Sequence, residues 1–158
     1  MKKLLITFLK LLILLFAIGI LAGLIWFPQT EGRAVNLDIL SIYTDPFIIY
    51  IYIGSIPFFV GLSQVFKLLT LIDTNQIYSH NSVAILRYIK LASLCQIGFI
   101  ALSIFYIGFF VHGDDNTGPI SLGIIMSIVV GTIAIITSIV QKSIHDALHT
   151  KSEKELTV

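Results

Sequence analysis

The chain has 158 residues, of which 56% are hydrophobic and only 12% are charged. Soluble domains carry about 25% charged residues, so this composition excludes an ordinary water-soluble globular enzyme, and its apolar content excludes an intrinsically disordered chain. The formal net charge of +1 gives no support for direct nucleic-acid binding, and the single cysteine, Cys95, excludes an internal disulfide. The sequence therefore predicts a small polytopic membrane protein, with residues 1–158 in one all-α domain.

Four apolar stretches are each long enough to cross a bilayer, which requires about 20 apolar residues in a helix. None of them alternates with a period of two, and a helix satisfies its own backbone groups in lipid. We therefore predict a four-transmembrane-helix bundle with spans over residues 4–27, 47–72, 91–111 and 120–140. Helical extensions outside the bilayer are expected over 82–90, where Asn81 or Ser82 is a good N-cap, and over 141–150.

Basic residues gather on one side of this predicted arrangement. The side with both chain ends holds Lys2, Lys3, Lys10, Lys67, Arg87, Lys90, Lys142, Lys151 and Lys154. The loops on the other side, 28–46 and 112–119, hold only Arg33. Cytoplasmic loops carry such an excess of Lys and Arg, so we predict a multi-pass protein of the cell membrane with both termini cytoplasmic.

Small residues recur along the predicted spans, where they let helix backbones approach closely. The set is Gly19, Gly23, Gly54, Gly61, Gly98, Gly108, Gly123, Ser127 and Gly131. We expect these residues to mark the inward faces of a compact bundle, and contact with a second subunit in a homo-oligomer is the alternative. Pro57 lies in the second span, where it removes a backbone hydrogen bond and predicts either a static bend or a hinge.

Ionisable residues inside a membrane usually mark function, but no Asp, Glu or His lies in the middle of a predicted span. This pattern argues against a proton-coupled antiporter. Gln64 and Gln96 are the polar residues of interest, and we interpret them as hydrogen-bonding contacts between helices, with an inner polar pocket as the alternative. His145 and His149 have the spacing of two ligands of one metal, yet no third ligand is evident. The sequence therefore predicts no catalytic residue, no cofactor and no metal site.

The connection between the second and third spans, together with the C-terminal tail, resembles a bacterial family of uncharacterised four-span membrane proteins, the YoaS-like family. The residues that carry the resemblance are Tyr78, Ser79, Asn81, Leu86, Arg87 and Ile89. The tail 154–158 looks like the acidic end of that family, with Lys154-Glu155 where an Asn-Asp pair usually stands. The resemblance implies no established activity. Members are often encoded near small helix-turn-helix regulators, which implies a membrane partner for such a regulator.

Three functions are compatible with these features. The leading hypothesis is a non-enzymatic membrane protein that senses, or docks a cytoplasmic regulatory protein, through contacts at Asn81, Arg87 and Lys90. A small oligomeric transporter or channel is the first alternative, and an immunity or resistance protein that packs against another membrane protein is the second. The sequence leaves the ligand, the partner and the oligomeric state open.

Overall fold

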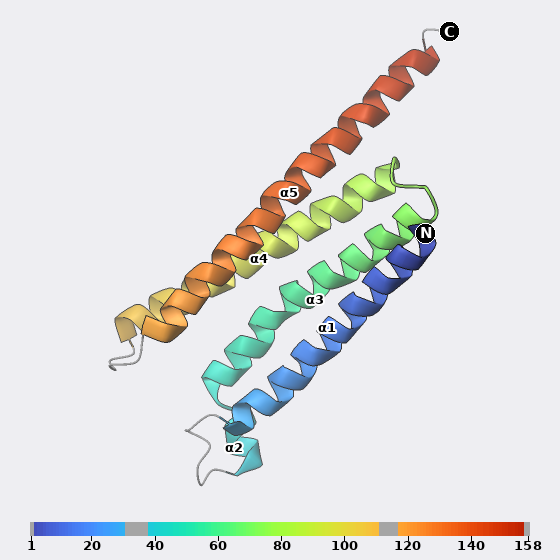
Figure 1. The fold of residues 1–158 in the computed structure, drawn as a ribbon. Helices are drawn as coiled ribbons and strands as arrows, with labels where there is room; N and C mark the ends of the chain where they lie inside the picture. The colour runs from blue at the N-terminus through green and yellow to red at the C-terminus, as the bar shows by residue number, and fades with distance from the viewer. Residues whose placement is uncertain (1, 31–37, 111–116, 157–158) are drawn as a thin grey trace.

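The computed structural model describes residues 2–30, 38–110 and 117–156, and every regular element in these ranges is an α-helix (Figure 1). The helices are α1 Lys2–Thr30, α2 Ile39–Tyr43, α3 Pro46–Asp73, α4 His80–Phe110 and α5 Thr117–Leu156. All of them except α2 are long and apolar enough to cross a bilayer. The predicted all-α class with four candidate spans is thereby confirmed.

Two of the long helices, α4 and α5, extend far past their predicted spans at one end. The segments 82–90 and 141–150, expected as helical extensions, are continuous with α4 and α5. With 40 residues, α5 is about 60 Å long at 1.5 Å per residue, roughly twice the hydrocarbon thickness of a bilayer. Its last turns project past the rest of the molecule (Figure 1). A large part of α5 therefore has to lie outside the hydrocarbon.

The start of α3 shows how local sequence sets a helix boundary. The Asp45 side chain accepts a hydrogen bond from the backbone N–H of Phe47 at 2.7 Å, which caps the first turn. Pro46 occupies the first helical position, where a missing N–H costs nothing. Pro57 lies within α3 and is half-buried, and the helix continues on both sides of it.

The four long helices pack as a row in chain order, a more open arrangement than the compact bundle that we expected. α3 lies against α1 on one side and α4 on the other, and α4 makes the most extensive contact of all with α5. Both chain ends lie at the same end as the connection between α3 and α4 (Figure 1). We call this the hairpin end, formed by residues 2–10, 65–90 and 141–156.

Some of the predicted small residues lie where two helices meet. A Cβ atom would come within 4 Å of a side chain on another helix at Gly54, Gly61, Gly108, Gly123 and Gly131. The closest approach is at Gly123 of α5, where a Cβ would lie 2.9 Å from Cγ1 of Ile104 in α4. Ser127, one turn further along α5, is half-buried. Glycine at position 123 therefore permits the close packing of α4 against α5.

Three other glycines do not mark contacts within the described chain. Gly19, Gly23 and Gly98 are exposed, and a Cβ atom at any of them would meet nothing within 4 Å. The expectation of inward faces does not hold at these positions, because the spacing of small residues does not specify which side of a helix meets a neighbour. Contact of Gly19 and Gly23 with a second subunit stays a prediction.

Tyrosine hydroxyls supply hydrogen bonds between helices. Tyr50 of α3 donates to the carbonyl oxygen of Phe99 in α4 at 2.6 Å, and Tyr52 donates to the carbonyl oxygen of Leu24 in α1 at 3.1 Å. Tyr43 of α2 makes a similar bond to a carbonyl of α1. Interhelical hydrogen bonds in lipid contribute about 0.6 kcal/mol on average, so these bonds add orientation more than stability.

We predict that Gly123→Val destabilises the protein by about 1–3 kcal/mol, because a branched side chain overpacks the contact with Ile104. Gly98→Val on the facing helix is the matched control, since its Cβ meets open space. The measurement is the thermal unfolding midpoint of both variants in the same detergent. Equal midpoints for the two variants would contradict the close approach of α4 and α5.

Candidate functional site

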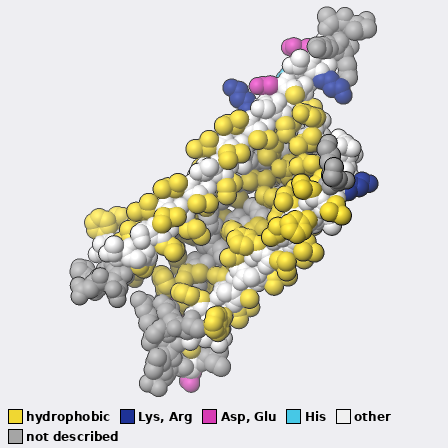
Figure 2. All heavy atoms as spheres, viewed as in Figure 1, with side chains coloured by type: hydrophobic (Ala, Val, Ile, Leu, Met, Phe, Trp, Pro, Cys, Tyr) yellow, Lys and Arg dark blue, Asp and Glu magenta, His cyan; other side chains and the backbone are white. Residues whose placement is uncertain are grey.

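Charged side chains gather at the hairpin end, while hydrophobic side chains cover most of the remaining surface of the face in Figure 2. The isoleucines in the middle of α5 illustrate the apolar surface, since Ile128 is 64% exposed and Ile136 is 56% exposed. Side chains of this kind are stable at a surface only where lipid or another apolar partner covers them. The change from apolar to charged surface therefore indicates where the helices leave the bilayer.

A cluster of buried apolar side chains joins α3, α4 and α5 at the hairpin end. Its centre consists of Ile85, Leu86 and Ile89 from α4 and Ile144 from α5, each between 3% and 6% exposed. The side chains packed around this centre are Val65, Leu68, Leu71, Ile77, Val83 and Leu148. The hairpin end therefore has a core like that of a soluble helical protein, and we call it the hairpin core.

The C-terminal end of α3 closes with a Schellman motif. The backbone N–H of Gln76 donates to the carbonyl oxygen of Leu71 at 2.8 Å, and the N–H of Asn75 donates to that of Ile72 at 3.2 Å. Asn75 has φ 56°, a left-handed conformation that asparagine tolerates better than most residues. The chain therefore leaves α3 along a defined path instead of through a long flexible loop.

The start of α4 is fixed by two serines. The Ser79 hydroxyl accepts a hydrogen bond from the backbone N–H of Ser82 at 3.3 Å, so the N-cap is Ser79 and not Asn81 or Ser82, the positions that we expected. Ser82 is fully buried, and its hydroxyl donates to the carbonyl oxygen of Gln76 at 3.3 Å. These bonds tie the connection to the first turn of α4.

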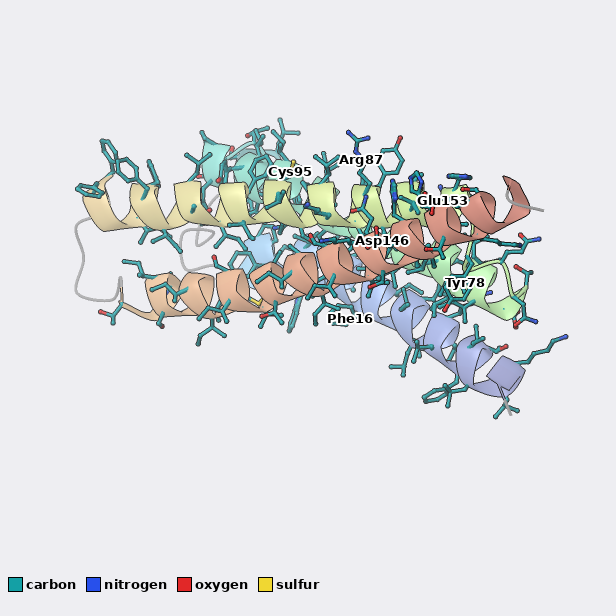
Figure 3. The ribbon with its side chains drawn as sticks, turned by 90° about the horizontal axis from the view of Figure 1, so that it is seen from above. Phe16, Tyr78, Arg87, Cys95, Asp146 and Glu153 are labelled. Atoms are coloured by element: carbon teal, nitrogen blue, oxygen red, sulfur yellow. The ribbon has the colours of Figure 1, made fainter. Side chains whose placement is uncertain are left out.

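The three residues predicted to contact a partner lie on the first turns of α4. Asn81 and Arg87 are exposed, and Lys90 is half-buried. Figure 3 shows Arg87 projecting outward from the ribbon. Tyr88 beside it is 57% exposed, and Leu91 one turn beyond is 48% exposed, so the outward side of α4 changes from polar to apolar near Arg87. This position suits the boundary between water and lipid.

Gln64 and Gln96 are both half-buried, and no described hydrogen bond joins them. Gly61 faces Ala92 across the α3–α4 contact, so Gln64 is level with Ile89 on the antiparallel helix. Gln96 lies about 10 Å further along α4 at 1.5 Å per residue. Its Oε1 atom is buried without a hydrogen-bond partner. The two amides are therefore at different depths, and their role as polar contacts between helices stays a prediction.

Histidines from two distant parts of the sequence meet at the hairpin end. The rings of His145 and His149 are stacked with centroids 4.6 Å apart, as their spacing on a helix predicts. A pocket of about 80 Å³ lies between α4 and α5, lined by His80, Val83, His145, Leu148, His149 and Ser152. Sequence reasoning missed His80, because only the packing of α4 on α5 brings it to the other two. Among the described residues, no group of three His, Cys, Asp or Glu side chains could hold a metal ion.

The four candidate spans and the apolar surface of the helices define a polytopic α-helical membrane protein. The model of a family described as a protein of unknown function (DUF2975) matches residues 6–158, and the chain belongs to this family. A curated relative is the uncharacterized membrane protein YoaS of Bacillus subtilis (strain 168), which is 33% identical over 162 residues, covering the whole of both chains. The predicted resemblance to the YoaS-like family is thereby confirmed. No solved structure matches the chain.

We predict that Ile144→Ala lowers the free energy of unfolding by about 2–5 kcal/mol, because it opens a cavity at the centre of the hairpin core. Ile139→Ala, on the same helix at a position 61% exposed, is the matched control and changes it by less than about 0.5 kcal/mol. Denaturant unfolding followed by circular dichroism measures both changes. A similar loss in both variants would show that the hairpin core does not stabilise the fold.

Proposed function

We propose that this protein is a non-enzymatic membrane protein of the cell membrane that docks a cytoplasmic protein at its hairpin end. In this proposal both termini are cytoplasmic. The concentration of Lys and Arg toward this end supports that orientation, since cytoplasmic segments near membrane spans are enriched in these residues. The absence of a nucleophile–base pair or a phosphate-binding loop from the sequence motivates the non-enzymatic assignment.

The observation that carries the proposal is the hairpin core with its exposed outer surface. Ile85, Leu86 and Ile89 pack inward and hold the first turns of α4 in place. Asn81 and Arg87 face outward on the same turns. A surface that is ordered before binding loses less conformational entropy when a partner docks. The hairpin end therefore has the physical properties of a docking platform.

The chemistry of the platform indicates what kind of partner it suits. Arg and Tyr are the side chains that most often dominate binding energy at protein interfaces, and Arg87 and Tyr88 are both exposed. A basic platform is complementary to an acidic surface. The small helix-turn-helix regulator implied by the resemblance suits this arrangement, because its basic DNA-reading face stays free if it docks through an opposite, acidic side.

A small oligomeric transporter or channel is the second candidate function. Two observations favour it: the Gln96 Oε1 atom is buried without a partner in a candidate span, and the Gly19 and Gly23 faces of α1 are open. A buried polar group in a membrane is costly unless it meets water, a solute or another polar group. A second subunit on α1 would fit the homo-oligomer that the glycine spacing suggests.

We predict that the double variant Arg87→Ala/Lys90→Ala weakens binding of the cytoplasmic partner at least tenfold, which corresponds to about 1.4 kcal/mol. The partner is captured by cross-linking in intact cells and identified by mass spectrometry, and binding is then measured with purified components. The matched control is Lys67→Ala/Lys142→Ala, which removes two exposed charges from the hairpin end outside the first turns of α4.

Equal binding by the two double variants would contradict a platform centred on α4. If no cytoplasmic protein is captured and the reconstituted protein passes a solute across vesicles, the transporter or channel becomes the better account. Thermal unfolding of both double variants shows whether a loss of binding has a structural cause, because Lys90 is half-buried.

A further inference from the structure

Each of the four long helices carries a lysine or an arginine toward the hairpin end, and the packing of the helices brings one from each helix to nearly the same level. They are Lys10 of α1, Lys67 of α3, Arg87 of α4 and Lys142 of α5. We call this set the basic ring. Lys67, Arg87 and Lys142 are exposed, and Lys10 is half-buried. Of the four, the docking surface uses Arg87, so the proposed function leaves the ring as a whole unexplained.

The contact between α3 and α4 sets the level of two members. The two helices run antiparallel (Figure 1), and a Cβ atom at Gly61 of α3 would lie 3.6 Å from the Cβ atom of Ala92 in α4. Toward the hairpin end, Lys67 is about six residues from Gly61, and Arg87 is about five residues from Ala92. At 1.5 Å per residue, Lys67 and Arg87 are therefore about level along the helix axes.

Lys10 reaches the same level from α1. Its Nζ atom lies 5.5 Å from the centroid of the Phe66 ring on α3, and Phe66 directly precedes Lys67 in the chain. A cation over an aromatic face is attracted by the ring, so Phe66 helps to hold the ammonium group near the level of Lys67. The charge of Lys10 therefore lies at the edge of the apolar surface.

The contact between α4 and α5 brings Lys142 to this level as well. A Cβ atom at Gly131 of α5 would lie 3.9 Å from the Cδ1 atom of Ile97 in α4. Toward the hairpin end, Lys142 is about eleven residues from Gly131, and Arg87 is about ten residues from Ile97. The common level of the four residues is thus a result of helix packing, since their positions in the sequence are unrelated.

The length of helix between the basic ring and the opposite end of the molecule matches a bilayer. At 1.5 Å per residue, α1 from Lys10 to Thr30 and α3 from Lys67 back to Pro46 each measure about 30 Å. The corresponding parts of α4 and α5 measure about 35 Å and 38 Å. The hydrocarbon core is about 30 Å thick, and a tilted helix crosses it with a few more residues. The basic ring therefore stands where the helices enter the headgroup region.

We propose that the basic ring binds the phosphate groups of anionic phospholipids in the leaflet at the hairpin end. Lysine and arginine at a membrane surface attract anionic lipids, and arginine can donate two hydrogen bonds to one phosphate. The surface next to the ring suits acyl chains. One or two turns toward the opposite end, Val60 of α3 is 43% exposed and Leu91 of α4 is 48% exposed. Charge for the headgroup and apolar surface for the chains thus lie in the order that a phospholipid requires.

Bound headgroups would set the depth at which the protein sits in the bilayer. Asn81 is about six residues before Arg87 on α4, so it would stand about 9 Å farther into water. The first turns of α4 would then project from the headgroup region. This inference does not rest on the proposed function, because Lys67 and Lys142 are not part of the docking surface.

The test is native mass spectrometry of the full-length protein, released from micelles that contain phosphatidylglycerol and phosphatidylcholine with the same acyl chains in equal amounts. The measured quantity is the ratio of the two lipids that stay bound. We expect phosphatidylglycerol to predominate on the unaltered protein. We expect Lys67→Ala/Lys142→Ala to lower the ratio at least about fivefold, the preference that one basic residue near a membrane surface contributes. Lys67→Arg/Lys142→Arg keeps both charges and is expected to keep the ratio.

The matched control is Lys3→Ala/Lys151→Ala, which removes the same charge from exposed positions about 10 Å or more from the basic ring along α1 and α5. That distance is about one Debye length at physiological salt, so we expect an unchanged ratio. Equal binding of the two lipids by the unaltered protein, or an equal fall in both alanine variants, would overturn the lipid site. Lys67→Ala/Lys142→Ala is also expected to retain the cytoplasmic partner, so failure of the lipid site and failure of the docking platform are distinguishable.

Discussion

The packing of Ile144 against Ile85, Leu86 and Ile89 is the interaction on which the rest of the hairpin end depends. Inside lipid, burying an apolar side chain between helices gains little, because the lipid tails are equally apolar. Where helices extend into water, the same burial contributes about 25 cal/mol per Å² of apolar surface. The hairpin core therefore joins α3, α4 and α5 most firmly at the place where the charged surface begins. Along the candidate spans, close contacts such as that at Gly123 and tyrosine hydrogen bonds to backbone carbonyls replace this driving force.

The fold class could be predicted from the sequence, because the chain has few charges and four apolar stretches long enough to cross a bilayer. In lipid such stretches satisfy their backbone hydrogen bonds as helices. The sequence was insufficient for the contacts between them. Gly19 and Gly98 match the small-residue pattern yet face open space, whereas Gly123 lies in the tightest contact. The spacing of small residues shows which of them share one side of a helix. It does not show whether that side faces another helix. Hydropathy likewise carries no signal for the bond from Tyr50 to the neighbouring helix.

The candidate site shows the same division. The exposed position of Arg87 follows from the periodicity of the first turns of α4, where every third or fourth residue packs into the hairpin core. The shared face of His145 and His149 follows from their spacing. The position of His80 near them does not follow from the sequence, because it depends on the register in which α5 packs along α4. Long-range register of this kind is set by packing, and a single sequence does not display it.

We infer that the hairpin end lies in the cytoplasm, and cysteine accessibility is the direct test of this orientation. In a Cys95→Ser background, single cysteines replace the exposed residues Gln76 and Ser152 at the hairpin end and Gly118 at the opposite end of α5. Intact cells are treated with a maleimide that does not cross the membrane. We expect the cysteine at 118 to react at once, and those at 76 and 152 to react only after the membrane is permeabilised. Labelling of 76 and 152 in intact cells, with 118 protected, would contradict it.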